Sequence, residues 1–280
     1  GVQTCALPIS QAILDFLGVE QSAPSVAFLD ALVAGYVRRV PWESASRIVR
    51  RAQTPITADC PRWPDEFWQG AMTHGFGGTC YESNYAFFAL LQSLGFEAYL
   101  TVNNMEASIG CHTAIVVTLD NARWLGDVVI PLHVPGPLIA GPATQREGPF
   151  HTYHITPEAA NTYTISRQLH PKPYIFTLID APVNEADYRR VTTADYGADG
   201  LFLERVIVTR IVDGAIWRFS GEQPPYHLET FPAGNVTYHL LGMGSVEAAA
   251  GISAKFAIDA ATVQAALEQV RHQADSKSTQ

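Results

Sequence analysis

The feature that most constrains the fold of this chain is a change of hydrophobic period near Phe96. Before it, apolar residues recur three and four positions apart, as at Leu29, Leu32 and Val33, which is the spacing of an amphipathic helix. After it, short segments rich in β-branched and aromatic residues alternate with turn formers, which is typical of strands. Helices, then strands, then a mixed end form the α+β pattern rather than alternating βαβ units. Neither glycine-rich nucleotide motif, GxGxxG or GxxxxGK[ST], occurs in the chain.

The same periodicity predicts the individual elements. Helices are expected over 11–20, 26–40, 65–74 and 81–95, with a short helical segment after Pro41 and a last helix starting near Asp259. Strands are expected over 96–105, 112–119, 123–130, 150–155, 162–168, 173–180 and, as a hairpin, 205–220. Loops or linkers are expected over 52–64, 131–149, 187–188 and 195–200, and the tail from His272 is expected to fray.

Three parts follow from these elements: a helical domain over 11–95, a β domain over 96–195 and a mixed α/β domain over 196–280. A length of 280 residues gives about two domains as a rough prior. The first ten residues, GVQTCALPIS, resemble translated sequencing-adapter sequence. We therefore treat residues 1–10, and Cys5 with them, as a non-native leader.

Composition narrows the class of protein and its partners. Hydrophobic residues make up 47% of the chain and charged residues 16%, which argues against disorder. The net charge is −9 and like charges do not cluster, so neither nucleic acid nor an anionic membrane is an expected partner. No apolar run is long enough to span a bilayer, and no secretory signal is recognisable. Four cysteines in 280 residues fit reduced thiols, so we expect a cytoplasmic protein.

One cysteine lies in a context that favours chemistry. Gly77 and Gly78 allow a sharp turn, and Cys80 then opens a strongly apolar helix. A thiol at a helix N-terminus is favoured as the nucleophilic thiolate. The amide of Tyr81 would point to where an oxyanion could form. The alternative is a buried structural cysteine, a common role for this residue type.

His112 and Asp127 are the expected partners of that thiol. His112 starts one predicted strand and Asp127 lies near the end of the next, with a turn at residues 120–122 between them. The two ends should meet at the open end of the hairpin, where Asp127 could fix the imidazole tautomer and His112 could accept the proton of Cys80. Either residue alone reads more simply as structural, but all three in this order are much less expected by chance. A metal shared by Cys111 and His112 is not expected, because adjacent strand residues point to opposite faces.

These residues resemble the arylamine N-acetyltransferases. The family motif RGGxCxExN is similar to the GGTCYESN segment here, and the step of 15 from His112 to Asp127 is the family's step. The segment 40–44, VPWES, is similar to the proline-aromatic-Glu-Asn segment of the family. The resemblance covers roughly residues 24–240. It implies an N-terminal helical bundle, a central antiparallel β-barrel-like domain and a C-terminal mixed α/β lid around a cysteine-proteinase-like core.

The resemblance also assigns roles to residues. It implies a catalytic triad of Cys80, His112 and Asp127. Support of the loop and the oxyanion is expected from Gly77, Gly78, Tyr81, Glu82 and Asn84. Glu82 and Asn84 are expected to orient the loop through hydrogen bonds rather than to react. Pocket candidates are Trp42, Phe76 and Val129.

The chain departs from the family at three places. Phe76 stands where the motif has arginine, Ser44 stands where the upstream segment has asparagine, and residues 128–131 read VVIP instead of Val-Gly-Phe-Gly. The triad chemistry is kept, whereas the usual arylamine specificity is expected to change. An amide synthase of the same family is therefore an alternative.

The implied mechanism is ping-pong acyl transfer through an acyl-Cys80 thioester. Acetyl-coenzyme A is the expected co-substrate and an amine, hydrazine or hydroxylamine the acceptor, with no metal and no permanently bound cofactor. A transglutaminase-like thiol hydrolase, with water as the acceptor, is a second class. A binding domain that keeps the fold is a third, but it would be expected to have a broken triad. The acceptor, the acyl length, the coenzyme A phosphate contacts and the oligomeric state are left open.

Overall fold

A computed structural model describes residues 8–129, 134–168, 173–198, 200–232 and 235–278. The chain forms two compact units, each built from separate stretches. The first unit comprises residues 1–37 and 83–188, and the second comprises residues 38–82 and 189–280. Among the described residues, no helix is long and apolar enough to cross a membrane.

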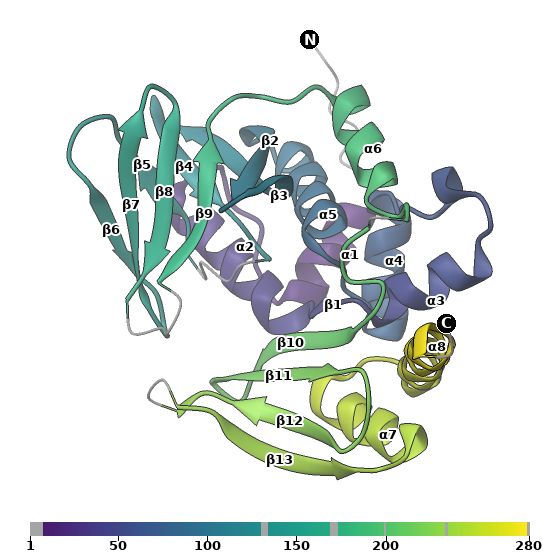
Figure 1. Ribbon diagram of the computed structural model, residues 1–280. Helices are drawn as coiled ribbons and strands as arrows, with labels where there is room; N and C mark the ends of the chain where they lie inside the picture. The colour runs from purple at the N-terminus through teal and green to yellow at the C-terminus, as the bar shows by residue number, and fades with distance from the viewer. Residues whose placement is uncertain (1–7, 130–133, 169–172, 199, 233–234, 279–280) are drawn as a thin grey trace. The chain divides into compact units, whose positions relative to one another are not determined.

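The first unit is organised around an eight-stranded sheet of order β5-β4-β3-β2-β9-β8-β7-β6, with antiparallel neighbours throughout (Figure 1). Its strands are β2 (Glu97–Met105), β3 (Ser108–Leu119), β4 (Ala122–Gly126), β5 (Gly136–Leu138), β6 (Thr144–Glu147), β7 (Thr152–Ala159), β8 (Thr162–Arg167) and β9 (Tyr174–Ile179). The two edge strands, β5 and β6, lie close to each other, as shown by a hydrogen bond of 2.9 Å from Thr144 Oγ1 to the carbonyl of Pro137. The sheet is therefore nearly closed into a barrel, as expected.

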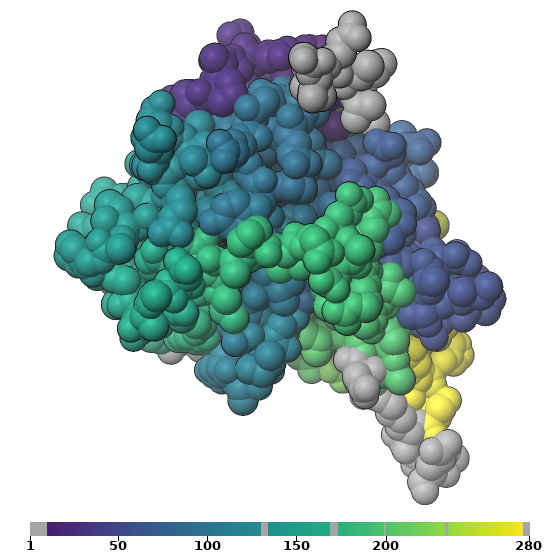
Figure 2. Space-filling model, turned by 90° about the horizontal axis from the view of Figure 1, so that it is seen from above, coloured from purple at the N-terminus to yellow at the C-terminus, as the bar shows by residue number. Residues whose placement is uncertain are grey.

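Four helices accompany this sheet, and two of them pack against each other through apolar side chains. They are α1 (Pro8–Leu17), α2 (Val26–Arg39), α5 (Cys80–Ser93) and α6 (Glu185–Ala194), of which α2, α5 and α6 cross a unit boundary. The rings of Tyr36 on α2 and Phe87 on α5 meet edge to face at 5.4 Å. Phe87 and Leu91 are fully buried, and each contributes roughly 1.5–3 kcal/mol relative to an exposed side chain. The first turn of α6 lies at the surface (Figure 2, green). Glu185 in this turn is exposed, whereas Tyr188 points inward and is buried.

The second unit contains a five-stranded antiparallel sheet of order β1-β10-β11-β12-β13. Its strands are β1 (Trp42–Glu43), β10 (Val206–Val212), β11 (Ala215–Gly221), β12 (Tyr226–Thr230) and β13 (Thr237–Gly242). Its helices are α3 (Ala45–Gln53), the short 3₁₀ helix η1 (Thr57–Asp59), α4 (Pro64–His74), α7 (Ser245–Phe256) and α8 (Ala260–Ser278). Val263, Leu267 and Val270 line the buried face of α8 and join the core of this unit.

The fold class is confirmed, while several element predictions are wrong. The segment 131–149, predicted as an irregular loop, contains β5 and β6; its residues 131–133 lie outside the described residues. Helix α8 continues to Ser278 instead of fraying from His272, because no glycine or proline interrupts the stretch after Asp259. Residues 187–188, predicted as a linker, lie within helix α6. The sequence analysis did not predict β1, β12, β13 or α7.

The beginning of the chain also differs from expectation. Helix α1 starts at Pro8, within the stretch that we treated as leader. Ser10 is buried and its Oγ lies 2.9 Å from Oγ of Ser93, so these residues belong to the fold. Residues 1–7, including Cys5, lie outside the described residues. The division into domains at 95 and 195 stays a prediction, and the helices of 11–95 are shared between the two units.

Candidate active site

The thiol of Cys80 is held by a loop that runs in direct contact with β1. Cys80 is the first residue of α5 and is 6% exposed. Gly78 forms an isolated bridge with Trp42, and its carbonyl accepts a hydrogen bond from the amide of Glu43 at 3.3 Å. A Cβ atom on Gly77 would lie 1.7 Å from the carbonyl oxygen of Pro41, which is sterically impossible. Glycine is therefore required at position 77 by the close approach of two backbones.

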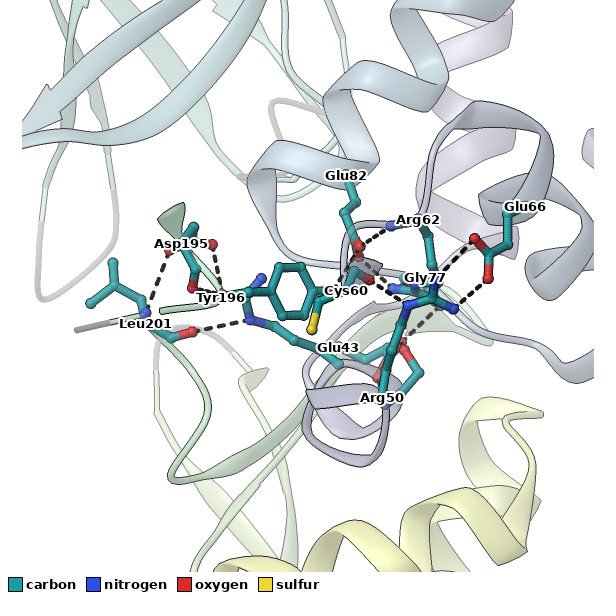
Figure 3. A network of polar contacts seen from close by, with 12 residues as sticks. Glu43, Arg50, Cys60, Arg62, Glu66, Gly77, Glu82, Asp195, Tyr196 and Leu201 are labelled. Carbon is teal, nitrogen blue, oxygen red and sulfur yellow. Dashed lines mark hydrogen bonds and ion pairs between the residues drawn. The ribbon is translucent and has the colours of Figure 1, made fainter. Parts of the chain in front are cut away.

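Glu82, in the first turn of α5, is the centre of a buried polar network (Figure 3). Its carboxylate accepts hydrogen bonds from the backbone amide of Arg62 at 2.8 Å, from Nη2 of Arg62 at 2.6 Å and from the hydroxyl of Tyr196 at 2.7 Å. Burial alone would raise the pKa of Glu82, but the charge and hydrogen bonds of Arg62 outweigh it and lower the pKa. Burial and the neighbouring Glu82 charge raise the pKa of Tyr196. Glu82 is thus an ionised anchor at the positive end of α5.

A second carboxylate, that of Glu43, holds the other side of the loop. Its Oε1 accepts the amide hydrogen of Gly77 at 3.1 Å, and its Oε2 accepts that of Ser46 at 2.9 Å. Ser44 Oγ donates to the carbonyl of Arg205 at 2.8 Å and accepts from the amide of Ile207 at 2.9 Å. The Trp-Glu-Ser segment therefore joins the Cys80 loop to the five-stranded sheet of the second unit.

The first unit carries a buried histidine–aspartate pair. His112 on β3 and Asp127, just after β4, are 2% and 0% exposed. Nε2 of His112 lies 2.6 Å from Oδ2 of Asp127. Strands β3 and β4 form the antiparallel hairpin that the sequence predicted, and the ring of Phe176 lies 4.5 Å from the imidazole. The hairpin thus brings the two side chains into hydrogen-bond contact, as expected.

Asn84 fixes the orientation of the aspartate. Its Nδ2 donates to the carbonyl of Thr113 at 2.7 Å and to Oδ1 of Asp127 at 3.4 Å, and its Oδ1 accepts from the amide of Val128 at 3.3 Å. The amide of Val129 donates to Oδ1 of Asp127 at 2.9 Å. Both carboxylate oxygens are occupied, so the pair is held in one geometry. Asn84 was expected to orient the Cys80 loop, whereas its hydrogen bonds in the structure orient Asp127 and the residues around it.

The remaining candidates are placed as follows. Tyr81 is buried beside Cys80 on α5. The ring of Trp42 meets that of Phe202 edge to face at 4.9 Å. Phe76 stacks on His74 at 5.1 Å and packs against the core of the second unit. Val129 is half-buried. The role of Trp42, Phe76 and Val129 as pocket walls stays a prediction.

The cysteines and acids do not form a further ligand set in the part of the chain that is described. No group of three His, Cys, Asp or Glu residues there could hold a metal ion. Within the described residues, no disulfide involves Cys60, Cys80 or Cys111. Burial raises the pKa of Cys60 despite three nearby arginines.

Sequence reasoning missed two functional candidates, Arg62 and Glu43. Glu43 could have been found, because it belongs to the Trp-Glu-Ser segment that was matched to the family. Arg62 lies in a segment predicted as loop, twenty residues from Glu82, and no local pattern marks it.

Comparison with known proteins places these features in a family. A family model described as N-acetyltransferase matches residues 25–226. Proansamycin X synthase of Amycolatopsis mediterranei is 31% identical over 128 residues, which are 42% of this chain and 47% of that protein. The match thus spans about half the length of this curated relative.

Solved structures share the fold. The Mycobacterium smegmatis arylamine N-acetyltransferase is 21% identical with a TM-score of 0.77, and the alignment covers 92% of this chain and 97% of that one. The Mycobacterium abscessus enzyme is 22% identical with a TM-score of 0.74, covering 95% and 96%. The Mycobacterium marinum enzyme in complex with CoA is 15% identical with a TM-score of 0.75, covering 93% and 98%. The chain therefore belongs to the N-acetyltransferase family of enzymes that this model describes, and it shares the fold of the arylamine N-acetyltransferases.

Proposed function

We propose that this enzyme transfers an acetyl or another short acyl group from coenzyme A to an amine- or hydrazine-type acceptor through a thioester on Cys80. The observation that carries the proposal is the buried hydrogen bond between His112 and Asp127. Such a pair serves to orient an imidazole that exchanges protons with a nucleophile. The family membership and the CoA complex of the Mycobacterium marinum relative support the choice of acyl donor.

The proposed first half-reaction loads the enzyme. Nε2 of His112 is engaged by Asp127, so Nδ1 is the nitrogen available to accept the proton of the Cys80 thiol. The thiolate attacks the thioester carbonyl, and the amide of Tyr81 is a candidate donor to the developing oxyanion. Collapse breaks the bond to coenzyme A sulfur, which leaves with the proton held by His112. The acyl group is then bonded to Cys80.

The second half-reaction releases the product. The acceptor amine gives a proton to His112 as its nitrogen attacks the acyl carbon. The carbon–sulfur bond to Cys80 breaks, and the proton returns to the thiolate. Cys80 and His112 return to their starting protonation states, so the atoms and protons of the two half-reactions balance without a resident cofactor.

Intact mass spectrometry after incubation with acetyl-coenzyme A tests the proposal. We expect a gain of one acetyl group on the native protein, mapped to Cys80, with release of one coenzyme A thiol per chain. Cys80→Ser should gain nothing under the same conditions, and His112→Gln should load much more slowly. Absence of an acyl-enzyme in the native protein, with acyl donors of several lengths, would refute the proposal.

A second candidate is an amide synthase that joins an amine and an acyl group of a larger substrate. It is favoured by the similarity to Proansamycin X synthase and by the valines at 128 and 129, where the family usually has Val-Gly. Branched side chains make the wall beside Asp127 bulkier and stiffer than glycine would. We therefore expect acylation of Cys80 to be faster than steady-state turnover of small arylamines such as aniline derivatives.

Single-turnover acylation and steady-state acceptor turnover separate these possibilities. Fast acylation with slow arylamine turnover supports an altered acceptor, and efficient arylamine turnover supports the ordinary family activity. Rapid decay of the acyl-enzyme without any amine would instead indicate the thiol hydrolase. Location in the cytosol stays a prediction.

A further inference from the structure

Arg62 touches both sides of the Cys80 turn with a single nitrogen atom. Its Nη2 donates to the carbonyl of Gly77 at 2.8 Å and to Oε2 of Glu82 at 2.6 Å (Figure 3). Gly77 precedes Cys80 by three residues and Glu82 follows it by two. The backbone amide of Arg62 adds a third contact, to Oε1 of Glu82 at 2.8 Å. One residue thus bridges the loop before the thiol and the helical turn after it.

We infer that Arg62 is a positioning residue that holds the Cys80 thiol and the first amides of α5 in reactive geometry. The inference rests on the proposed acyl transfer at Cys80 and deepens it. The amides of the first turn are useful only if they face the forming oxyanion, and small displacements of such groups cost large factors in rate. Arg62 does not need to touch the substrate for this role.

A cation is needed at this place because the carboxylate is buried. Glu82 is 1% exposed, Arg62 5% and the adjacent Tyr196 fully buried. An ionised carboxylate at such depth is tolerated when a charged partner and several donors compensate the lost hydration. Arg62 and Tyr196 supply them, and both come from segments remote from Cys80 in the sequence.

The loop itself offers no such cation. The residue directly before Gly77 is Phe76, which stacks on His74 and packs on the core. The family motif has arginine at that position, so this chain departs from the motif where a guanidinium would be nearest to the turn. The guanidinium that reaches the Gly77 carbonyl here comes from Arg62, fifteen residues upstream.

A merely structural ion pair would have different consequences. Removing one partner of a buried pair strongly destabilises a fold because it leaves an uncompensated charge, whereas replacing both by hydrophobic residues of similar volume is often neutral or stabilising. Glu82→Gln is combined with Arg62→Met because it removes the second charge and keeps an acceptor for the backbone amide of Arg62. Under a purely structural role, the double replacement should restore activity together with stability. Under the positioning role, it should restore stability, but acetyl transfer to Cys80 should stay slow.

The test compares Arg62→Met, Glu82→Gln and the double variant with the native enzyme. Readouts are the melting temperature, the single-turnover rate of acetyl transfer to Cys80, and the pH profile of Cys80 alkylation by iodoacetamide. Arg218→Met is the matched control, because it removes a partly exposed arginine that pairs with Glu229 in the same unit. The control should leave all three readouts close to native.

We expect the double variant to melt near the native temperature and to acylate about 100-fold more slowly, the scale of a displacement of about 1 Å. Its alkylation profile should move to higher pH. Native acylation and alkylation in the double variant would overturn the inference, and this holds even if Arg62→Met alone does not fold. If the native protein is never acylated, the proposed function fails, and the alkylation profile alone decides the role of Arg62.

Discussion

Replacing Gly77 by alanine is expected to disable the Cys80 loop by steric overlap alone. The added Cβ would lie 1.7 Å from the carbonyl oxygen and 2.8 Å from the carbonyl carbon of Pro41. Real Cβ contacts essentially never fall under 3.0 Å, so the two backbones must separate by about 1.3 Å, the difference between 3.0 and 1.7. Neither contact atom belongs to a flexible side chain that could turn away.

The displacement would act on the contacts that define the loop. Separating Gly77 from Pro41 strains the Trp42–Gly78 bridge and the hydrogen bond from Gly77 to Glu43. Overpacking of this kind costs roughly 1–3 kcal/mol of stability. A misplacement of about 1 Å costs about 100-fold in rate, which corresponds to about 2.7 kcal/mol in the activation barrier. We therefore expect Gly77→Ala to fold and to acylate Cys80 about 100-fold more slowly.

The assay is single-turnover acetylation of Cys80, followed by intact mass, on protein whose folding is checked by thermal melting. Gly244→Ala is the control, because a Cβ at that glycine of the same unit meets nothing closer than 3.7 Å. The control should acylate at the native rate. Acylation of Gly77→Ala at the native rate would contradict this prediction, since it would mean that the close approach to Pro41 does not constrain the thiol.

Three further results are expected. Asp127→Asn should slow acylation by about 10²–10⁴-fold without unfolding, because the amide no longer selects the imidazole tautomer; single-turnover acylation with thermal melting checks this, and an unchanged rate would show that the pair is structural. Iodoacetamide at pH 6 should label Cys80 faster than Cys60 or Cys111, since a helix N-terminus favours the thiolate while burial raises the pKa of Cys60; equal rates by peptide mapping would count against an activated thiol. The lowered pKa of Glu82 implies stability that is present above the ordinary value of about 4.3 and is lost as pH falls through the folded pKa. Chemical denaturation should therefore show that the native protein's free energy of unfolding exceeds that of Glu82→Gln by less and less below about pH 4. A difference that stays constant with pH would contradict the ion pair.

Some of the site could be predicted because its parts are local. His112 and Asp127 lie on neighbouring strands joined by a short turn, so their spacing along the chain implies their contact. Cys80 follows two glycines and opens an apolar helix, and both signals are contained within a few residues. Periodic burial likewise predicted most helices and central strands, since each face repeats within one or two turns.

Strands whose apolar residues do not follow a regular alternation were not predicted. In β13, Tyr238 and Leu240 are among the more exposed large apolar residues, so apolar residues there do not indicate an inward face. Strands β5 and β6 lie in a segment rich in proline and glycine, which reads as loop. These residues form strands because they lie where the two edges of the eight-stranded sheet come together. Pro137 accepts a hydrogen bond from Thr144, and Gly136 packs on Ile155.

The polar network around Cys80 was decided by tertiary structure alone. A buried carboxylate must find charge and donors wherever the fold supplies them, and distance along the chain does not enter that requirement. Glu82 receives Arg62 from twenty residues upstream and Tyr196 from 114 residues downstream. The α+β class, the nucleophile turn and the histidine–aspartate hairpin could be read from the amino-acid order, because each depends on neighbours along the chain. The remote side chains that hold that turn in place could not be read in this way, because their stabilising contacts depend on burial that the folded unit as a whole creates.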